Sequence, residues 1–98
     1  AAIVSDAMQD LGLEPTDKPC RVHILAQFEI PKSYSKKRRE ACVRGEEHPR
    51  RGDIDNYVKA VLDAANGVVF EDDVQVVRLM ATKRYGDPMI LVSVEWDE

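Results

Sequence analysis

The stretch that decides the fold is R-G-D-I-D-N-Y-V-K-A-V-L-D-A-A-N-G, residues 51–67. Asp53 stands where a helix N-cap is expected, and the Asn-Gly pair that ends the stretch is a typical helix stop. Between them, apolar side chains recur at helical spacing and form one face: Ile54, Val58, Val61, Leu62 and Ala65. The stretch therefore predicts an amphipathic helix that packs its apolar face on another layer.

Strand patterns lie on both sides of this helix. Residues 20–30 alternate apolar and polar side chains, as a half-buried strand does, and Pro31 ends the alternation. Residues 75–85 and 89–96 also look like strands, and the Gly-Asp-Pro sequence between them predicts a turn that makes a C-terminal hairpin.

Two further helices are expected before the central one. The pattern of residues 2–11 predicts an amphipathic helix that Gly12 ends, and residues 33–44 are compatible with a short basic helix. The order of all these elements predicts an α+β fold, with a mixed sheet packed by two to three helices. At 98 residues the chain is expected to form a single domain, residues 1–98, with one core.

The composition excludes some classes of protein. No apolar run approaches the roughly 20 residues that a membrane-spanning helix needs, and the N-terminus lacks the pattern of a secretory signal. Cys20 and Cys42 have no CxxC spacing and no His or Cys cluster nearby, so we expect reduced thiols and no zinc site. These observations favour a cytoplasmic protein that does not enter membranes.

Charge is segregated along the chain. The net charge is −4, yet residues 32–51 carry eight basic and three acidic side chains, a net +5, so the other residues sum to −9. A surplus of acid argues against a nucleic-acid partner when it is evenly spread. The segregation instead favours one polyanion-binding face with acidic metal ligands beside it.

Carboxylates cluster around the central helix. Asp53 and Asp55 stand at its beginning, and Asp72 and Asp73 fall in the turn before the next strand. Hydrolysis of a phosphodiester near neutral pH needs an activated water and neutralised phosphate charge, and Mg²⁺ held by carboxylates supplies both. Lys59 lies one helical turn after Asp55 and faces the same way, within reach of the carboxylates or of a bound phosphate.

Each of these residues also has a structural interpretation. Asp53 alone is more typical of an N-cap than of a metal ligand. Lys59 could form ordinary surface pairs with Asp55 and Asp63, which contribute only tenths of a kcal/mol. Asp72 and Asp73 could form a solvated turn. Their occurrence together, next to a basic segment, is what favours a catalytic site.

The motifs of this region carry a family resemblance. D-I-D-N-x-x-K-x-x-x-D-A at 53–64, N-G at 66–67 and F-E-D-D-x-Q at 70–75 closely resemble the RusA family of Holliday junction resolvases. T-K-R-Y-G-D at 82–87 resembles its phage and prophage branch.

The resemblance implies a RusA-like fold and an endonuclease of DNA recombination and repair. It implies a homodimer that makes paired nicks in four-way DNA junctions, with Mg²⁺ as its cofactor, Mn²⁺ as a substitute and no small-molecule cofactor. By position it implies the catalytic residues Asp53, Asp55, Asp73 and Lys59. The implied metal ligands are Asp53, Asp55 and Asp73, with Asp72 as a neighbour that substitutes or assists.

The sequence departs from the family pattern at its start. Family members usually open with a further strand rich in proline and basic residues, and this sequence starts at the helix expected after it. One edge of the sheet is therefore expected to be missing.

The basic residues are expected to bind DNA. Arg50 and Arg51 border the acidic stretch and are predicted to hold the phosphates of the strand that is cut. Lys36, Lys37, Arg38 and Arg39 form a run, which is either a solvated face or a contact with the DNA backbone. A non-catalytic module that binds branched DNA with the same fold is the alternative, and a scaffold whose acids are caps and surface pairs is a third.

Overall fold

The computed structural model describes residues 14–97, which form an α+β domain with one mixed sheet, as the sequence predicts. The helix predicted over residues 2–11 lies outside the described residues. The elements, in chain order, are strand β1 (Cys20–Phe28), helix α2 (Lys36–Val43), helix α3 (Ile54–Ala65), 3₁₀ helix η1 (Asp73–Gln75), strand β2 (Val76–Tyr85) and strand β3 (Met89–Trp96).

The sheet has the strand order β2-β1-β3, with β1 parallel to β2 and antiparallel to β3. The predicted C-terminal hairpin is therefore wrong, because β2 and β3 lie on opposite edges of β1 and do not pair. Their connection crosses the end of β1, where the Gly86 N–H donates to the Phe28 carbonyl at 2.9 Å. The Gln27 side-chain amide also donates to the Asp87 carbonyl at 3.1 Å.

The strand order follows from the burial of β1. Its side chains at Cys20, Val22, Ile24 and Ala26 are each 3 % exposed or less, whereas β2 and β3 hold many exposed positions. A strand with so apolar a face buries the most surface at the centre of a sheet, because both of its edges are also paired there. The short turn fixes only that β2 and β3 are antiparallel, which a strand between them also permits.

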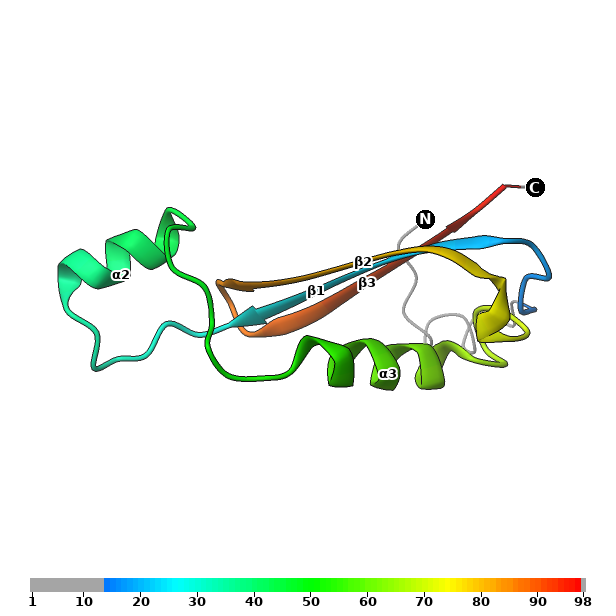
Figure 1. Ribbon diagram of the computed structural model, residues 1–98, viewed down its shortest axis with the longest axis horizontal. Helices are drawn as coiled ribbons and strands as arrows, with labels where there is room; N and C mark the ends of the chain where they lie inside the picture. The colour runs from blue at the N-terminus through cyan, green and yellow to red at the C-terminus, as the bar shows by residue number, and fades with distance from the viewer. Residues whose placement is uncertain (1–13, 98) are drawn as a thin grey trace.

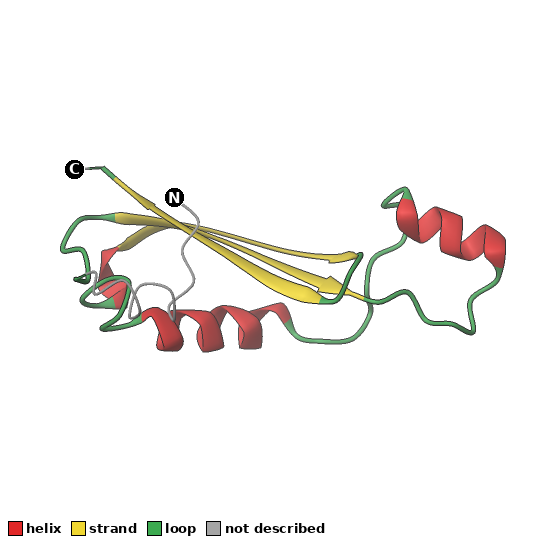
Figure 2. Ribbon diagram, turned by 180° about the vertical axis from the view of Figure 1, so that it is seen from behind, coloured by secondary structure: helices red, strands yellow, loops and turns green. Residues whose placement is uncertain are grey.

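Helix α3 covers one face of the sheet. Its apolar face packs Val58, Val61 and Leu62 against the core, as its sequence pattern predicts. Ala65 and Phe70, which lie at and after its end, are buried. In Figure 1 the helix runs along the sheet, whereas α2 stands beyond the end of the strands. Figure 2 shows the same arrangement from behind.

Among the described residues, no helix covers the opposite face of the sheet (Figures 1 and 2). Met80 is 57 % exposed there and Leu91 is 53 % exposed. Both cysteines are buried and neither forms a disulfide, as expected from their spacing. Among residues 14–97, neither α-helix has the length and apolar character that crossing a membrane requires.

Candidate active site

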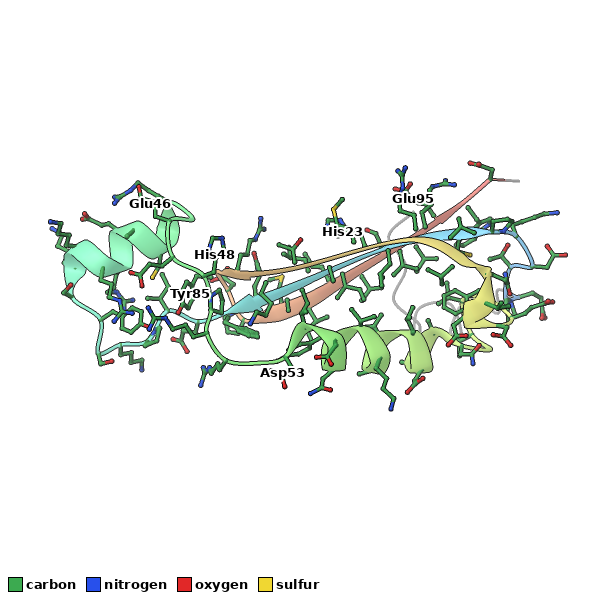
Figure 3. All side chains as sticks on the ribbon, in the orientation of Figure 1. His23, Glu46, His48, Asp53, Tyr85 and Glu95 are labelled. Carbon is green, nitrogen blue, oxygen red and sulfur yellow. The ribbon has the colours of Figure 1, made fainter. Side chains whose placement is uncertain are left out.

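Asp53 and Asp55 lie exposed at the start of α3. Asp53 occupies the N-cap position, with an extended backbone, but its side chain makes no capping hydrogen bond. Asp53 therefore occupies the position of a cap, but its carboxylate does not cap the helix. That carboxylate is turned outward at the beginning of the helix (Figure 3).

The loop that delivers Asp53 is held by a lysine on β2. Lys83 Nζ donates to the Gly52 carbonyl at 2.8 Å and to the Arg51 carbonyl at 3.3 Å. Gly52 has φ +83°, and the rings of Phe28 and Tyr57 close around its α-carbon. The backbone in front of Asp53 is therefore fixed from both sides.

Asp72 and Asp73 have different surroundings. Asp72 caps η1: its Oδ1 accepts from the Val74 N–H at 3.0 Å, and the Gln75 side chain accepts from the Asp72 N–H at 2.8 Å. The pKa of Asp73 is raised by a hydrogen bond with the Asp72 carboxyl, by desolvation and by the negative charges of Asp72 and Asp63. Of the pair, Asp72 has a structural partner and Asp73 sits among like charges.

The predicted metal ligands fall into two groups at opposite ends of α3. The helix has 12 residues and rises by roughly 18 Å, at about 1.5 Å per residue. Asp53 and Asp55 stand at its start, whereas Asp73 stands with Asp63 near its end, where η1 contacts α3. Within residues 14–97, no group of three or more acidic, His or Cys side chains is arranged to hold one metal ion.

Lys59 lies between the two groups, on the exposed side of α3. No ion pair of the described residues joins its ammonium to Asp55 or to Asp63, so the surface pairs considered from the sequence do not form. The Lys59 ammonium is therefore available to an anion that approaches the outer face of the helix.

The basic run of α2 divides by partner. The Arg38 guanidinium bonds Glu47 at 3.0 Å and lies 3.7 Å from the centre of the Tyr34 ring, and Arg39 donates to the Pro31 carbonyl at 3.0 Å. Two of the four basic side chains thus hold α2 and its flanking loops together. Lys36 and Lys37 are exposed and make no ion pair among the described residues.

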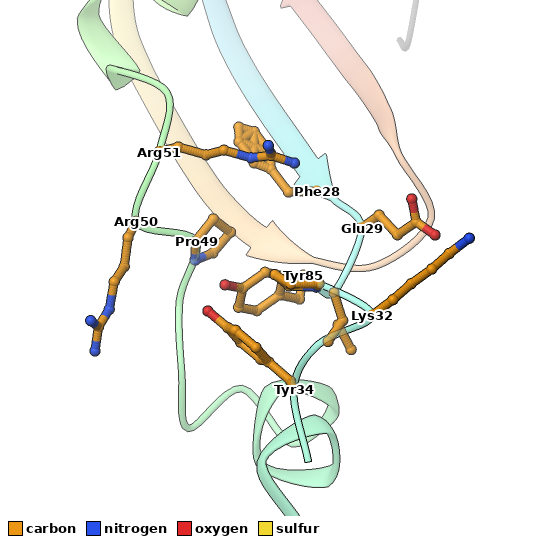
Figure 4. A pocket seen from close by; sticks show the side chains of 10 residues that line it. Phe28, Glu29, Lys32, Tyr34, Pro49, Arg50, Arg51 and Tyr85 are labelled. Carbon is orange, nitrogen blue, oxygen red and sulfur yellow. The ribbon is translucent and has the colours of Figure 1, made fainter. Parts of the chain in front are cut away.

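A cleft of about 480 Å³ opens beside the loop that leads to Asp53. It is lined by aromatic and basic side chains, among them Phe28, Tyr34, Tyr85, Arg50 and Arg51 (Figure 4). The Tyr34 and Tyr85 rings meet edge to face with centroids 6.5 Å apart, and a hydrogen bond between their hydroxyls raises the pKa of Tyr85 to about 12. In Figure 4, Arg51 extends toward Phe28 whereas Arg50 points away from it.

The roles of Lys83 and Gln75 do not follow from the family motifs that contain them. A signal for Lys83 exists in the strand pattern: its position alternates onto the face of the sheet that packs against α3, level with the buried Ala26, and a lysine there needs a specific partner. Gln75 offers no such signal in the sequence. Its side-chain amide donates to the carbonyls of Thr16 and Lys18, both at 2.9 Å, and so ties η1 to the segment before β1.

The fold and these groups define a small α+β domain that presents carboxylates and a basic, aromatic cleft side by side, as proteins that handle phosphate backbones do. The chain belongs to the RusA endodeoxyribonuclease family, whose model matches residues 1–95.

One curated relative is an uncharacterized protein, YqaN, of Bacillus subtilis (strain 168). It is 39 % identical over 80 residues, which cover 78 % of this chain and 56 % of the relative. The chain thus spans about half the length of the curated relative that it matches. No solved structure matches it significantly.

Proposed function

We propose that the protein is a metal-dependent endodeoxyribonuclease that resolves Holliday junctions or related branched DNA by paired phosphodiester hydrolysis. Membership of the RusA family supports this activity. The observation that carries the proposal is the uncapped Asp53 carboxylate, held by a fixed loop next to a basic and aromatic cleft.

The proposed catalytic residues are Asp53, Asp55, Asp73 and Lys59, with Mg²⁺ as cofactor and Mn²⁺ as a substitute. Carboxylate oxygens are the ligands that these ions prefer. The position of Lys59 supports a role in stabilising negative charge on the phosphate, because its ammonium is exposed between the two acidic groups. In one chain the proposed ligands fall into two groups at opposite ends of α3, and no three of these side chains among residues 14–97 surround one ion.

The proposed DNA contacts are of two kinds. Arg51, and Arg50 beside it, would hold the phosphates of the strand that is cut, because they adjoin Asp53 and line the cleft. Lys36 and Lys37 would contact the backbone farther away, because α2 stands beyond the end of the sheet (Figure 1). A homodimer suits the proposed substrate, since a two-fold junction offers two equivalent strands. Because branched DNA is an intracellular substrate, the proposed location is the cytoplasm, whether a bacterium or a phage encodes the protein.

The test is cleavage of a labelled four-way junction with Mg²⁺, with Mn²⁺ and with EDTA, beside a linear duplex of the same sequence. We expect paired nicks that need the metal and spare the duplex. Asp53→Asn and Asp73→Asn should each abolish the nicks while leaving the fold intact by circular dichroism. Metal-independent cutting, or equal cutting of the duplex, would overturn the proposal.

A non-catalytic module that binds branched DNA is the second candidate. The separation of the acidic groups along α3 favours it, because a chain that cannot gather its carboxylates cannot hold a catalytic ion. In that case the protein should bind the junction tightly in both Mg²⁺ and EDTA and never cut it. The same gel experiment therefore distinguishes the two candidates.

A further inference from the structure

Aromatic side chains gather at the end of the sheet that adjoins Asp53. The chain has two Phe, three Tyr and one Trp, and the ones that lie outside the hydrophobic core are Phe28, Tyr34, Tyr57 and Tyr85. Each of these rings is only partly buried. Phe28 packs on Tyr57 with ring centroids 5.9 Å apart, and Tyr34 meets Tyr85 with centroids 6.5 Å apart. The rings thus form an accessible aromatic surface that is separate from the core.

These rings line two adjoining hollows, which together we call the aromatic groove. The first hollow, of about 480 Å³, contains Tyr34 and Tyr85 (Figure 4). The second, also of about 480 Å³, contains Tyr57 and Gly52. Both volumes fall in the range of roughly 300 to 1,000 Å³ that is usual for ligand sites. The residues that line both hollows are Phe28, Glu29 and Arg51. The aromatic groove therefore leads from the loop before α2 to the residue before Asp53.

The rim of the aromatic groove is positively charged. Lys32, Arg50 and Arg51 line the first hollow, with Glu29 as the one carboxylate beside them. All four side chains are exposed, and none of them takes part in an ion pair of the described residues. The rim therefore attracts an anion, and the rings offer flat apolar faces next to it.

This combination favours an unpaired nucleotide over other occupants. A duplex keeps its bases stacked inside and would engage the cations alone, and an apolar peptide would engage the rings alone. A nucleotide that has left the duplex presents a phosphate and a free base face together. Proteins hold single strands in this way, with aromatic side chains on the bases and basic side chains along the backbone.

One ring of the aromatic groove is held in place by its neighbours. The Arg38 guanidinium lies 3.7 Å from the centre of the Tyr34 ring and bonds Glu47 at 3.0 Å. The Tyr34 hydroxyl also shares a hydrogen bond with that of Tyr85. A ring that is fixed in advance loses little conformational entropy when a base stacks on it.

We propose that the aromatic groove binds unpaired nucleotides of a DNA strand, whose bases stack on the rings while Arg50 and Arg51 hold their phosphates. That the strand is the one to be cut rests on the proposed function, because the groove ends at Gly52, next to Asp53. A strand seated there brings a neighbouring phosphate to the start of α3. Cutting is thereby confined to the branch point, where a nucleotide leaves the duplex.

The first experiment measures binding in EDTA, so that it does not depend on nuclease activity. The probe is a fluorescein-labelled oligothymidylate of roughly eight nucleotides. It is compared by anisotropy with a strand of the same length made of a stable abasic analogue, which has the phosphates and no bases. The oligothymidylate should bind roughly 5- to 150-fold more tightly for each base that stacks. Equal affinities would overturn the inference, because the groove would then hold phosphates alone.

Tyr34→Leu and Tyr34→Phe are the matched variants. Leucine removes the ring, whereas phenylalanine keeps it and loses only the hydroxyl. Tyr34→Leu should reduce the preference for the oligothymidylate over the abasic strand by roughly 5-fold or more, and Tyr34→Phe should retain it. Phe28→Leu tests the same ring surface from β1, in case Tyr34→Leu disturbs α2. A preference that survives in both leucine variants would contradict the inference.

A free nucleotide is the other possible source of a base with a phosphate. Thymidine monophosphate should compete only weakly with the oligothymidylate, because it lacks the neighbouring phosphates that Arg50 and Arg51 contact. Competition as strong as that of the unlabelled oligothymidylate would assign the aromatic groove to free nucleotides and overturn the inference.

The second experiment places the abasic analogue at the branch point of a labelled four-way junction, in the strand that is cut. It should slow nicking by the wild-type protein more than nicking by Tyr34→Leu, because the variant has already lost the stacking contact. Equal slowing would show that the groove does not hold the cut strand. If the protein prefers the oligothymidylate but never cuts a junction, the inference stands and the proposed nuclease activity fails. If it cuts junctions but shows no preference for bases, the nuclease activity stands and the inference is wrong.

Discussion

At the scale of single residues, the four aspartates of the proposed site are not equivalent. The Asp72 carboxylate accepts a hydrogen bond from the Val74 N–H, and the pKa of Asp73 is raised beside Asp72 and Asp63. Asp53 occupies a cap position without a capping bond. Taken by itself, the position of Asp53 in the sequence favours a cap, because a residue type at the start of a helix does not reveal where its side chain points; only the motif around it indicates a metal ligand.

The first prediction separates the capping aspartate from the uncapped one. Asp72→Ala should lower the free energy of unfolding by about 1 kcal/mol, because it removes the acceptor of the Val74 N–H. Asp53→Ala should cost on the order of 0.5 kcal/mol or less, since only its interaction with the helix dipole is lost. Urea denaturation in EDTA measures both. Equal losses would mean that Asp53 caps α3 in solution.

At the scale of elements, the loop between α2 and α3 positions the first aspartate of the proposed site. Gly45 and Gly52 both adopt positive φ, which other residues disfavour. Their surroundings differ, because a Cβ at Gly45 meets nothing within 4 Å, whereas one at Gly52 comes within 2.9 Å of Phe28 Cζ. The glycine before Asp53 is therefore required by both conformation and space.

The second prediction uses this pair of glycines. Gly45→Ala should destabilise the protein by about 1 kcal/mol, the cost of a positive φ for a residue with a Cβ. Gly52→Ala should cost a further 1 to 3 kcal/mol or so, because the new methyl group overpacks against the rings of Phe28 and Tyr57. Chemical denaturation of both variants measures the difference. Similar losses would show that the rings yield to the methyl group.

Element patterns were predictable to different degrees. Strands β1, β2 and β3 and helix α3 follow from the periodicity of their apolar residues, which depends only on neighbours along the chain. The pairing of β2 with β3 was predicted wrongly, because a short turn indicates a hairpin unless another strand enters between its arms. The insertion of β1 between β2 and β3 depends on residues about 60 positions before the turn, such as Gln27, whose side chain donates to the Asp87 carbonyl in the connection.

At the scale of the whole molecule, positive charge is not all available for DNA. The described residues form an elongated body of 48 × 26 × 21 Å, with α2 projecting at one end (Figure 1). Arg38 is already paired with Glu47, whereas Arg51 lines the cleft with its side chain exposed. A polyanion should therefore respond differently to the loss of these two arginines.

The third prediction compares them in DNA binding. Arg51→Ala should weaken junction binding and reduce the slope of log affinity against log salt by about one, because each neutralised phosphate releases roughly one counterion. Arg38→Ala should leave that slope unchanged and lower stability instead, since it breaks the contacts with Glu47 and Tyr34. Fluorescence anisotropy at several salt concentrations measures the slopes. An unchanged slope for Arg51→Ala would exclude its phosphate contact.

The sequence by itself determined the α+β class, the elements β1, α3, β2 and β3, and the family, because periodicity and motif words are local properties of the chain. It also marked Asp53, Asp55 and Asp73 as one candidate set. Only the tertiary structure decided that β1 lies between β2 and β3, that Lys83 holds the loop before Asp53, and that the carboxylates stand at opposite ends of α3. The physical reason is that residues about 20 positions apart can be neighbours or a helix length apart, and packing on the sheet selects between the two.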